Sequence, residues 1–192
     1  TILDAMASIT NNTFSTPIRI IVSPGTYVET ATIVMKQYVT VMGVNNEQCI
    51  VTQSNPANSV YSTGVTSSIR NILITGTTNA GVEYNGLSGV TSQFWMQDCQ
   101  FTNSTTHVKI SVASTHNVTY TMMNCIYKDS VVNVIDITVA NGRIMTMEAN
   151  DIFCNLNFLV STAFAYFIKV NTSSSFYPRL STQNIIFNAF PG

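Results

Sequence analysis

Three carboxylates are the residues best suited to acid–base chemistry: Glu83, Asp136 and Glu148. Glu83 and Asp136 lie 53 residues apart, and Lys109 stands between them at a spacing of 26 and 27 residues. If these spacings stack in a repeat, the two carboxylates lie about 9.6 Å apart, near the ~6.5–9.5 Å that separates acid and base in inverting glycosidases. However, a general acid must be protonated, and an ammonium between two carboxylates favours their ionised forms. We therefore interpret the series, which Lys169 continues, as a charge ladder that fixes register, with catalysis as the alternative.

Trp95 is the only tryptophan of the chain and is the candidate for contact with a sugar ring. Phe94 and Met96 alternate with it, so it is expected on the outward side of a strand, in one column with Thr121 and Glu148. An exposed indole beside polar groups can stack on a sugar, and it can equally be covered by a loop or a partner chain. Lys109 and Lys169 are further ligand-binding candidates on the outward surface.

Metal and cofactor chemistry is not expected. The four cysteines form no CxxC pair and no cluster with histidine, which zinc sites require. His107 and His116 stand alone in Thr- and Ser-rich surroundings, so we expect both on the surface. Only 9% of residues are charged and the net charge is -1, which argues against nucleic-acid binding. The most apolar stretch, residues 158–170, is too short to span a membrane.

A repeat organises the chain into one domain over residues 1–192. Five short segments each open with Asn or Asp and then place apolar residues at the next position and two positions later. Their openers are spaced 27, 26, 27 and 33 residues apart: Asn71, Asp98, Asn124, Asp151 and Asn184. We aligned residues 38–44 as one earlier copy, with Tyr38 in the place of the opener. Short strands that recur at this period predict a solenoid.

Two further columns keep the same spacing. One contains Val82, Val108, Ile135 and Ile168, and the other contains Phe94, Tyr120, Met147 and Leu180. Alternation of period 2 within each column marks strands with one buried face. Three strand columns in step predict a parallel β-helix of about six coils over residues 18–190. The outward charges after the first column predict a file that runs Ile50, Glu83, Lys109, Asp136, Lys169.

The opener column permits two interpretations. The functional one makes Asp98 and Asp151 catalytic acids. The structural one, which we favour, is an internal turn ladder in which an Asn amide donates to the carboxylate of the neighbouring coil. The ladder comprises Asn71, Asp98, Asn124, Asp151 and Asn184.

The segment RIIVSPGTYVETATIVMKQYVTVMGVN (19–45) resembles the first coil of pectin-lyase-like right-handed parallel β-helices, the class of pectin methylesterases, pectate lyases and viral tailspikes. The resemblance implies an all-β, single-stranded right-handed helix with a short helix over residues 1–12 that covers its N-terminal end. It also implies that catalytic residues, where present, lie on an outward strand face. The sequence motifs of the pectin methylesterases, polygalacturonases and pectate lyases are absent.

The resulting expectation is a non-enzymatic structural or adhesive module at a cell or virion surface. Self-association, with the trimer of tailspikes as one form, or contact with other surface proteins is expected, because the sequence ends without a second capping helix. The alternative is a polysaccharide-degrading or polysaccharide-binding protein of the same class, with Glu83, Asp136 or Glu148 as its acids. Four Asn-x-Ser/Thr sequons agree weakly with an extracellular location.

Overall fold

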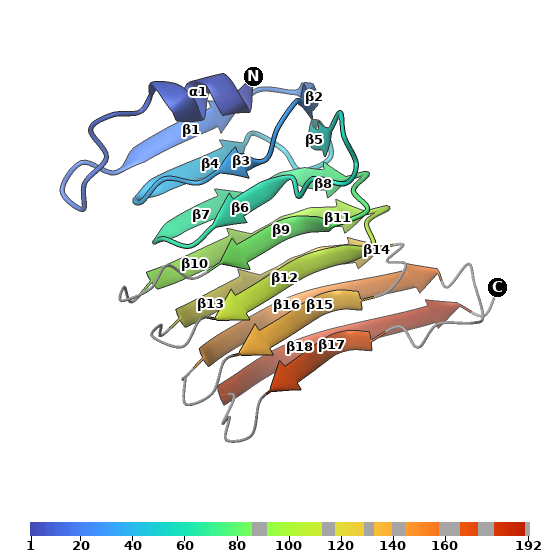
Figure 1. The fold of residues 1–192 in the computed structure, drawn as a ribbon. Coiled ribbons are helices and arrows are strands. Elements are labelled where there is room, and N and C mark those ends of the chain that lie inside the picture. Colours follow the sequence, from blue (N-terminus) through green and yellow to red (C-terminus); the bar gives the residue numbers. More distant parts are fainter. Residues whose placement is uncertain are drawn as a thin grey trace.

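A computed structural model shows the chain wound as a stack of parallel coils beneath one short helix (Figure 1). It describes residues 1–85, 92–112, 118–128, 133–139, 145–157, 166–172 and 179–190; side chains are described up to residue 138, apart from 86–91, 112–118 and 129–132. Every pairing between its named strands is parallel, and β10 (Ser92–Gln97), for example, lies between one strand of the preceding coil and one of the following coil. The parallel β-helix expected from the resemblance is therefore present.

Up to β15 (Asn133–Val139), each coil contributes one strand to each of three sides. The first side contains β1 (Ile18–Val22), β4 (Val39–Gly43), β7 (Ser67–Arg70), β10, β13 (Val118–Met123), β16 (Met145–Asn157) and β18 (Arg179–Phe190). The second side contains β2 (Gly25–Glu29), β5 (Cys49–Gln53), β8 (Leu73–Thr75), β11 (Gln100–Thr102) and β14 (Ile126–Lys128). The third side contains β3 (Ile33–Val34), β6 (Tyr61–Thr63), β9 (Ala80–Asn85), β12 (Thr106–Val112), β15 (Asn133–Val139) and β17 (Tyr166–Thr172). Because β16 pairs with both β13 and β14, the first two sides join there into one sheet.

The register between coils follows the period read from the sequence. Val82 pairs with Val108, which pairs with Ile135, and Phe94 pairs with Tyr120, which pairs with Met147. The coil count differs slightly from the six expected, because fewer than six coils among the described residues keep three separate strands. From β16 onward, one long strand replaces the two short strands of the first and second sides.

Two alignments in the early coils were wrong. Ile50 pairs with Leu73 on the second side, so the position before Glu83 in the charged file belongs to Ser62. Residues 38–44 belong to the first side, because Val39 pairs with Ser67. Both errors have one cause: all three sides alternate inward and outward residues with the same period, so alternation alone does not identify the side.

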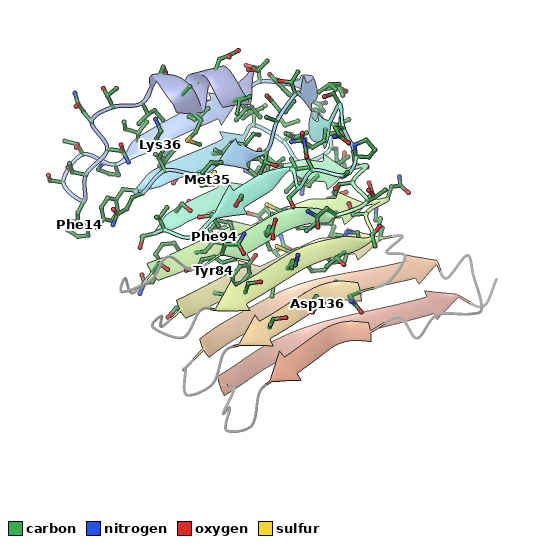
Figure 2. The ribbon with its side chains drawn as sticks, viewed as in Figure 1. Phe14, Met35, Lys36, Tyr84, Phe94 and Asp136 are labelled. Carbon is green, nitrogen blue, oxygen red and sulfur yellow. The ribbon has the colours of Figure 1, made fainter. Side chains whose placement is uncertain are left out.

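Inward side chains fill the space between the sides with aromatic and branched aliphatic residues. Tyr84, Phe94 and Tyr120 contact one another with ring centroids 5.2–6.4 Å apart, and Figure 2 shows Tyr84 and Phe94 between the strands. The buried hydroxyl of Tyr120 donates to the sulfur of Met96 at 3.3 Å. Phe101 stacks on Tyr127 at 5.0 Å. Such contacts add to the hydrophobic gain of burying the rings.

The helix α1 (Ile2–Ser8) covers the N-terminal end of the stack. Its residues Ile2 and Met6, one turn apart, are buried against the first coil, which explains why this short segment is helical in its context. Among the described residues no helix is long and apolar enough to cross a membrane.

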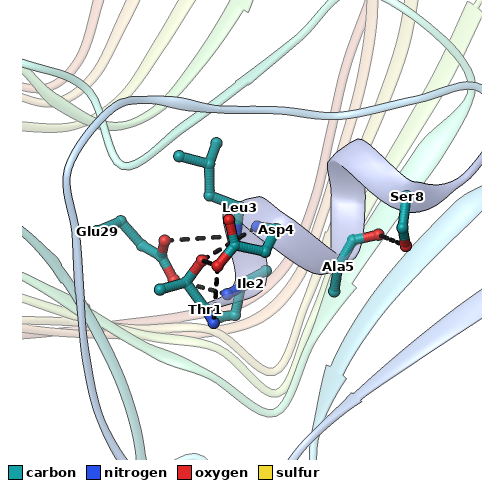
Figure 3. A network of polar contacts seen from close by, with 7 residues as sticks. All are labelled: Thr1, Ile2, Leu3, Asp4, Ala5, Ser8 and Glu29. Atoms are coloured by element: carbon teal, nitrogen blue, oxygen red, sulfur yellow. Dashed lines mark hydrogen bonds and ion pairs between the residues drawn. The ribbon is translucent and has the colours of Figure 1, made fainter.

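Two charged side chains of the first coil hold the ends of α1. The fully buried carboxylate of Glu29 accepts hydrogen bonds from the backbone N–H groups of Ile2 at 2.8 Å and Leu3 at 3.3 Å (Figure 3). At the other end, the ammonium of Lys36 donates to the carbonyls of Ala7 and Ile9. Both charges complement the helix dipole and satisfy groups that a helix end leaves free.

We expect Glu29→Ala to destabilise the fold by about 2–3 kcal/mol, because two buried N–H groups lose a charged acceptor. Equilibrium urea unfolding at neutral pH measures this loss. Glu47→Ala, which truncates an exposed glutamate, is the matched control and should cost less than about 0.5 kcal/mol. Equal stability of the two variants would show that Glu29 does not anchor the helix.

Candidate functional site

A groove of about 300 Å³ lies on the outward surface of the first side, across β4, β7 and β10. Three aromatic side chains line it, namely Phe14, Tyr38 and Trp95. Between them the surface consists of hydroxyl and amide side chains and short aliphatic groups: Pro17, Val39, Thr40, Thr66, Ser67, Ser68 and Gln93. Aromatic walls with a few placed polar groups are typical of sites for small organic ligands.

Trp95 occupies the outward position that its alternation with Phe94 and Met96 predicts. Its neighbours in register are Ser68 of β7 and Thr121 of β13. The indole is half-buried, and Ser68 and Thr121 are each almost fully buried although they share its outward column. The indole therefore lies between short side chains, on a strand buried at every second residue, and its position is well defined.

Phe14 and Tyr38 form the opposite wall of the groove. Their rings meet edge to face with centroids 5.8 Å apart. Phe14 is 83% exposed at the tip of a tight turn, where Thr13 and Thr16 exchange backbone hydrogen bonds (Figure 2). Asn12 ties this turn to the body of the protein, because its amide donates to the carbonyl of Gln37 at 2.6 Å.

Sequence reasoning found Trp95 and missed both residues of the opposite wall. Phe14 lies in the turn before the first coil, where no repeat assigns it a face. Tyr38 was placed in the opener column, whereas its backbone N–H donates to the carbonyl of Thr66 on the first side. The available signal was the run of small residues Thr66, Ser67 and Ser68, which leaves space between larger neighbours.

Neither Glu83 nor Asp136 lines this groove. Glu83 is on the third side, where one carboxylate oxygen lies 3.5 Å from the ammonium of Lys109 and the other accepts from Ser59 at 3.1 Å. Lys109 pairs in register with Asp136, whose carboxylate accepts from the amide of Asn133 at 3.2 Å (Figure 2). A half-exposed ion pair of this kind is worth well under about 1 kcal/mol.

Two other predicted residues are placed by backbone register only. Glu148 pairs with Thr121 and so continues the column of Trp95, two coils beyond it. Lys169 pairs with Asp136 on the third side. The side chains of Glu148 and Lys169 lie outside the described residues, and so does all of His116.

The opener positions are stacked in one file by the backbone. Asn71, Asp98 and Asn124 all have left-handed backbone conformations, with φ between 50° and 54°. Asn and Asp tolerate this conformation better than other residues with a side chain, which gives a local reason for their recurrence. The amide of Asn124 donates to the carboxylate of Asp98 at 2.6 Å.

This file runs along the surface of the turn and not inside it, because Asn124 is exposed and Asn71 and Asp98 are half-exposed. The expectation of an internal ladder was wrong in that respect. The register continues past Asn124, since Met123 pairs with Asn150 and Ile126 with Phe153. Asp151 and Asn184 therefore follow in the file by backbone position, and their side chains lie outside the described residues.

His107 is buried, which corrects the expectation of a surface histidine. Its ring lies 5.7 Å from the rings of both Phe101 and Tyr127, and neither ring nitrogen has a hydrogen-bond partner of normal geometry. Burial lowers the pKa of His107 from 6.5 to about 3, against a smaller opposing effect of the Lys128 backbone. Among the described residues no group of His, Cys, Asp or Glu is arranged to hold a metal ion.

Comparison with known proteins gives one distant structural similarity. No protein-family model matches the chain, and no curated protein matches it. Among solved structures, it is similar to pectin methylesterase PemA from Erwinia chrysanthemi over 96% of this chain and 88% of that chain. The sequence identity is 14% and the TM-score is 0.42. The class defined by the chain's own strand pairing is the parallel β-helix.

We expect acid to destabilise the fold through His107. Its pKa is lower in the folded state than in the unfolded state. Between about pH 6.5 and pH 3 the unfolded chain therefore binds a proton at this residue and the folded chain does not. The contribution of His107 to the free energy of unfolding is therefore fully present above pH 6.5. It falls by about 1.4 kcal/mol for each pH unit down to about pH 3.

The measurement is urea unfolding at several pH values for the parent and for His107→Val. Valine is the residue that the next coil carries at this position, since Thr106 pairs with Asn133 and Val108 with Ile135. The stability of His107→Val relative to the parent should improve steadily as the pH falls. A difference that does not change with pH would contradict this account.

Proposed function

We propose that this chain is a non-enzymatic β-helix module that binds carbohydrate in the groove between Trp95 and Tyr38. The observation that carries the proposal is that Phe14, Tyr38 and Trp95, from three separate segments, line one groove together with hydroxyl and amide groups. Sugar rings present C–H faces that suit aromatic rings, and their hydroxyls pair with Ser, Thr and Gln side chains.

In this proposal the acids of the third side, Glu83 and Asp136, have structural roles. Both oxygens of Glu83 have partners, one of them the ammonium of Lys109, and Asp136 is bonded to Asn133. These groups lie on the outward surface of the third side, whereas the aromatic groove lies on the first side. A binding module with this arrangement suits adhesion or attachment at a cell or virion surface.

We also propose that the module associates with further copies of itself through its N-terminal coil. Apart from Phe14 of the groove, most of the large apolar side chains that are exposed in the described part belong to the first two coils, namely Ile21, Val28, Val34 and Val44. Ile21, Val28 and Val34 each lie 53–63% exposed on the strands of the first coil. One of them lies on each side of the first coil, so an assembly that covers all three has to surround this coil.

Carbohydrate binding is tested by the emission of Trp95, which is the only tryptophan and therefore reports on the groove alone. A saccharide that binds should shift and saturate this emission. Phe14→Ala should weaken binding about fivefold to tenfold, because an aromatic contact is worth ~1 kcal/mol. Met123→Ala, an exposed apolar truncation outside the groove, is the control.

A full panel of neutral and acidic oligosaccharides that leaves the emission and the heat of mixing unchanged would refute the proposal. Release of reducing ends from a polysaccharide, abolished by Glu83→Gln or Asp136→Asn, would overturn its non-enzymatic part.

Self-association is tested by sedimentation equilibrium of the triple variant Ile21→Thr, Val28→Thr, Val34→Thr. Threonine keeps the β-branched shape, so the strands should be retained while the apolar surface is lost. We expect the parent to form an assembly that the variant weakens at least about tenfold. A parent that stays monomeric at high micromolar concentration would contradict this part of the proposal.

A further inference from the structure

The groove exists because one coil carries small outward side chains between two coils that carry large ones. Thr66 and Ser68 are the outward residues of this coil, at the start of β7. In register on either side of them stand Tyr38 with Thr40 and Gln93 with Trp95, because Ser67 pairs with Val39 in one coil and with Phe94 in the other. The size difference leaves a trench along β7.

The trench has a defined direction and width. Its two walls belong to strands two coils apart, which corresponds to about 9.6 Å between their backbones. Part of that width is taken up by the aromatic walls themselves, so the remaining space suits one chain of rings and no more. A ligand that lies along β7, across the direction in which the coils stack, can therefore contact both walls.

The floor of the trench offers hydroxyl groups. The hydroxyls of Thr40 and Ser68 are bonded to each other at 2.7 Å, and the hydroxyl of Thr66 accepts from the backbone N–H of Gln93 at 3.3 Å. Because Ser68 is almost fully buried, the half-buried Thr40 and Thr66 are the residues whose hydroxyls have further donor or acceptor capacity toward a ligand. These two hydrogen bonds thus fix the positions of the side chains on the floor of the trench.

None of the residues that line the trench carries a charge. The neighbouring cation in register is Arg19, which pairs with Thr40 one coil beyond the wall and is exposed to solvent. A charged ligand group that enters the trench loses water without gaining an opposite charge, which is unfavourable. The lining therefore favours an uncharged ligand.

We propose that the trench along β7 selects a neutral, unbranched oligosaccharide, held transverse to the solenoid between the walls formed by Tyr38 and Trp95. This inference rests on the proposed carbohydrate binding and adds the charge of the ligand, its linear shape and its direction. Branches are excluded because both walls lie against the bound chain.

The test is a substitution on the floor of the trench that fills it with a larger side chain. Thr66→Phe places a ring between the walls and leaves Phe14, Tyr38 and Trp95 unchanged. Ser62→Phe adds the same bulk to the outward face of the third side and is the matched control. Thr66→Leu is a second, smaller filling variant, and circular dichroism and thermal unfolding verify that each variant is folded.

The probes are linear α-1,4- and β-1,4-linked glucose hexamers and the hexamer of galacturonic acid, followed by Trp95 emission and calorimetry. We expect a glucose hexamer to bind the parent and to bind Thr66→Phe at least about tenfold more weakly, with Ser62→Phe within about twofold of the parent. The acidic hexamer should bind the parent at least about tenfold more weakly than the neutral one.

The outcomes separate the two levels of the proposal. If glucose hexamers bind and Thr66→Phe and Thr66→Leu leave their affinity unchanged, the trench is not the site, although carbohydrate binding stands. If the acidic hexamer binds as tightly as the neutral ones or more tightly, the selection for an uncharged ligand is wrong. If no saccharide binds the parent, carbohydrate binding itself is refuted and the trench proposal with it.

Discussion

The backbone register between successive coils is the constraint on which the rest of the structure depends. Each coil is hydrogen-bonded to the next in parallel, so a residue and its counterpart one coil later, 26 or 27 positions on in the middle of the chain, share one environment. Inward positions stack apolar side chains into a continuous core, and outward positions stack into columns on the surface. The groove, the charge ladder and the file of Asn and Asp residues each arise from one or two such columns. A change in the size or charge of one residue in a column alters that surface feature locally.

The first coil has an open strand edge that must be covered, and α1 covers it. Glu29 and Lys36 hold the two ends of α1 over the open edge, while Ile2 and Met6 bury its apolar face. The segment that runs from Gly25 to Glu29 thus serves the cap as well as the coil. The turn that carries Phe14 follows directly after this helix, so the cap also positions one wall of the groove.

Much of the fold could be predicted from the sequence, because stacked coils repeat their inward residues at a fixed spacing. The columns of Val82 and Phe94 are of this kind. What could not be predicted was which side an early strand occupies, as Ile50 shows, because the alternation is the same on all sides. His107 was misplaced because its own surroundings are polar. Of its neighbours in register, only Val134 in the following coil indicates an inward position, because Gly81 in the preceding coil has no side chain.

The candidate site was predictable in part for the same reason. Trp95 could be placed outward from its own strand, whereas Phe14 and Tyr38 join it through the path of a turn and the side on which β4 lies. The most direct measurement is therefore the set of intermolecular NOEs between the labelled protein and a bound glucose hexamer. The account predicts NOEs from the same saccharide to the Trp95 indole and to the ring of Tyr38. NOEs confined to the surface of Glu83 and Lys109, with none to Trp95, would contradict it.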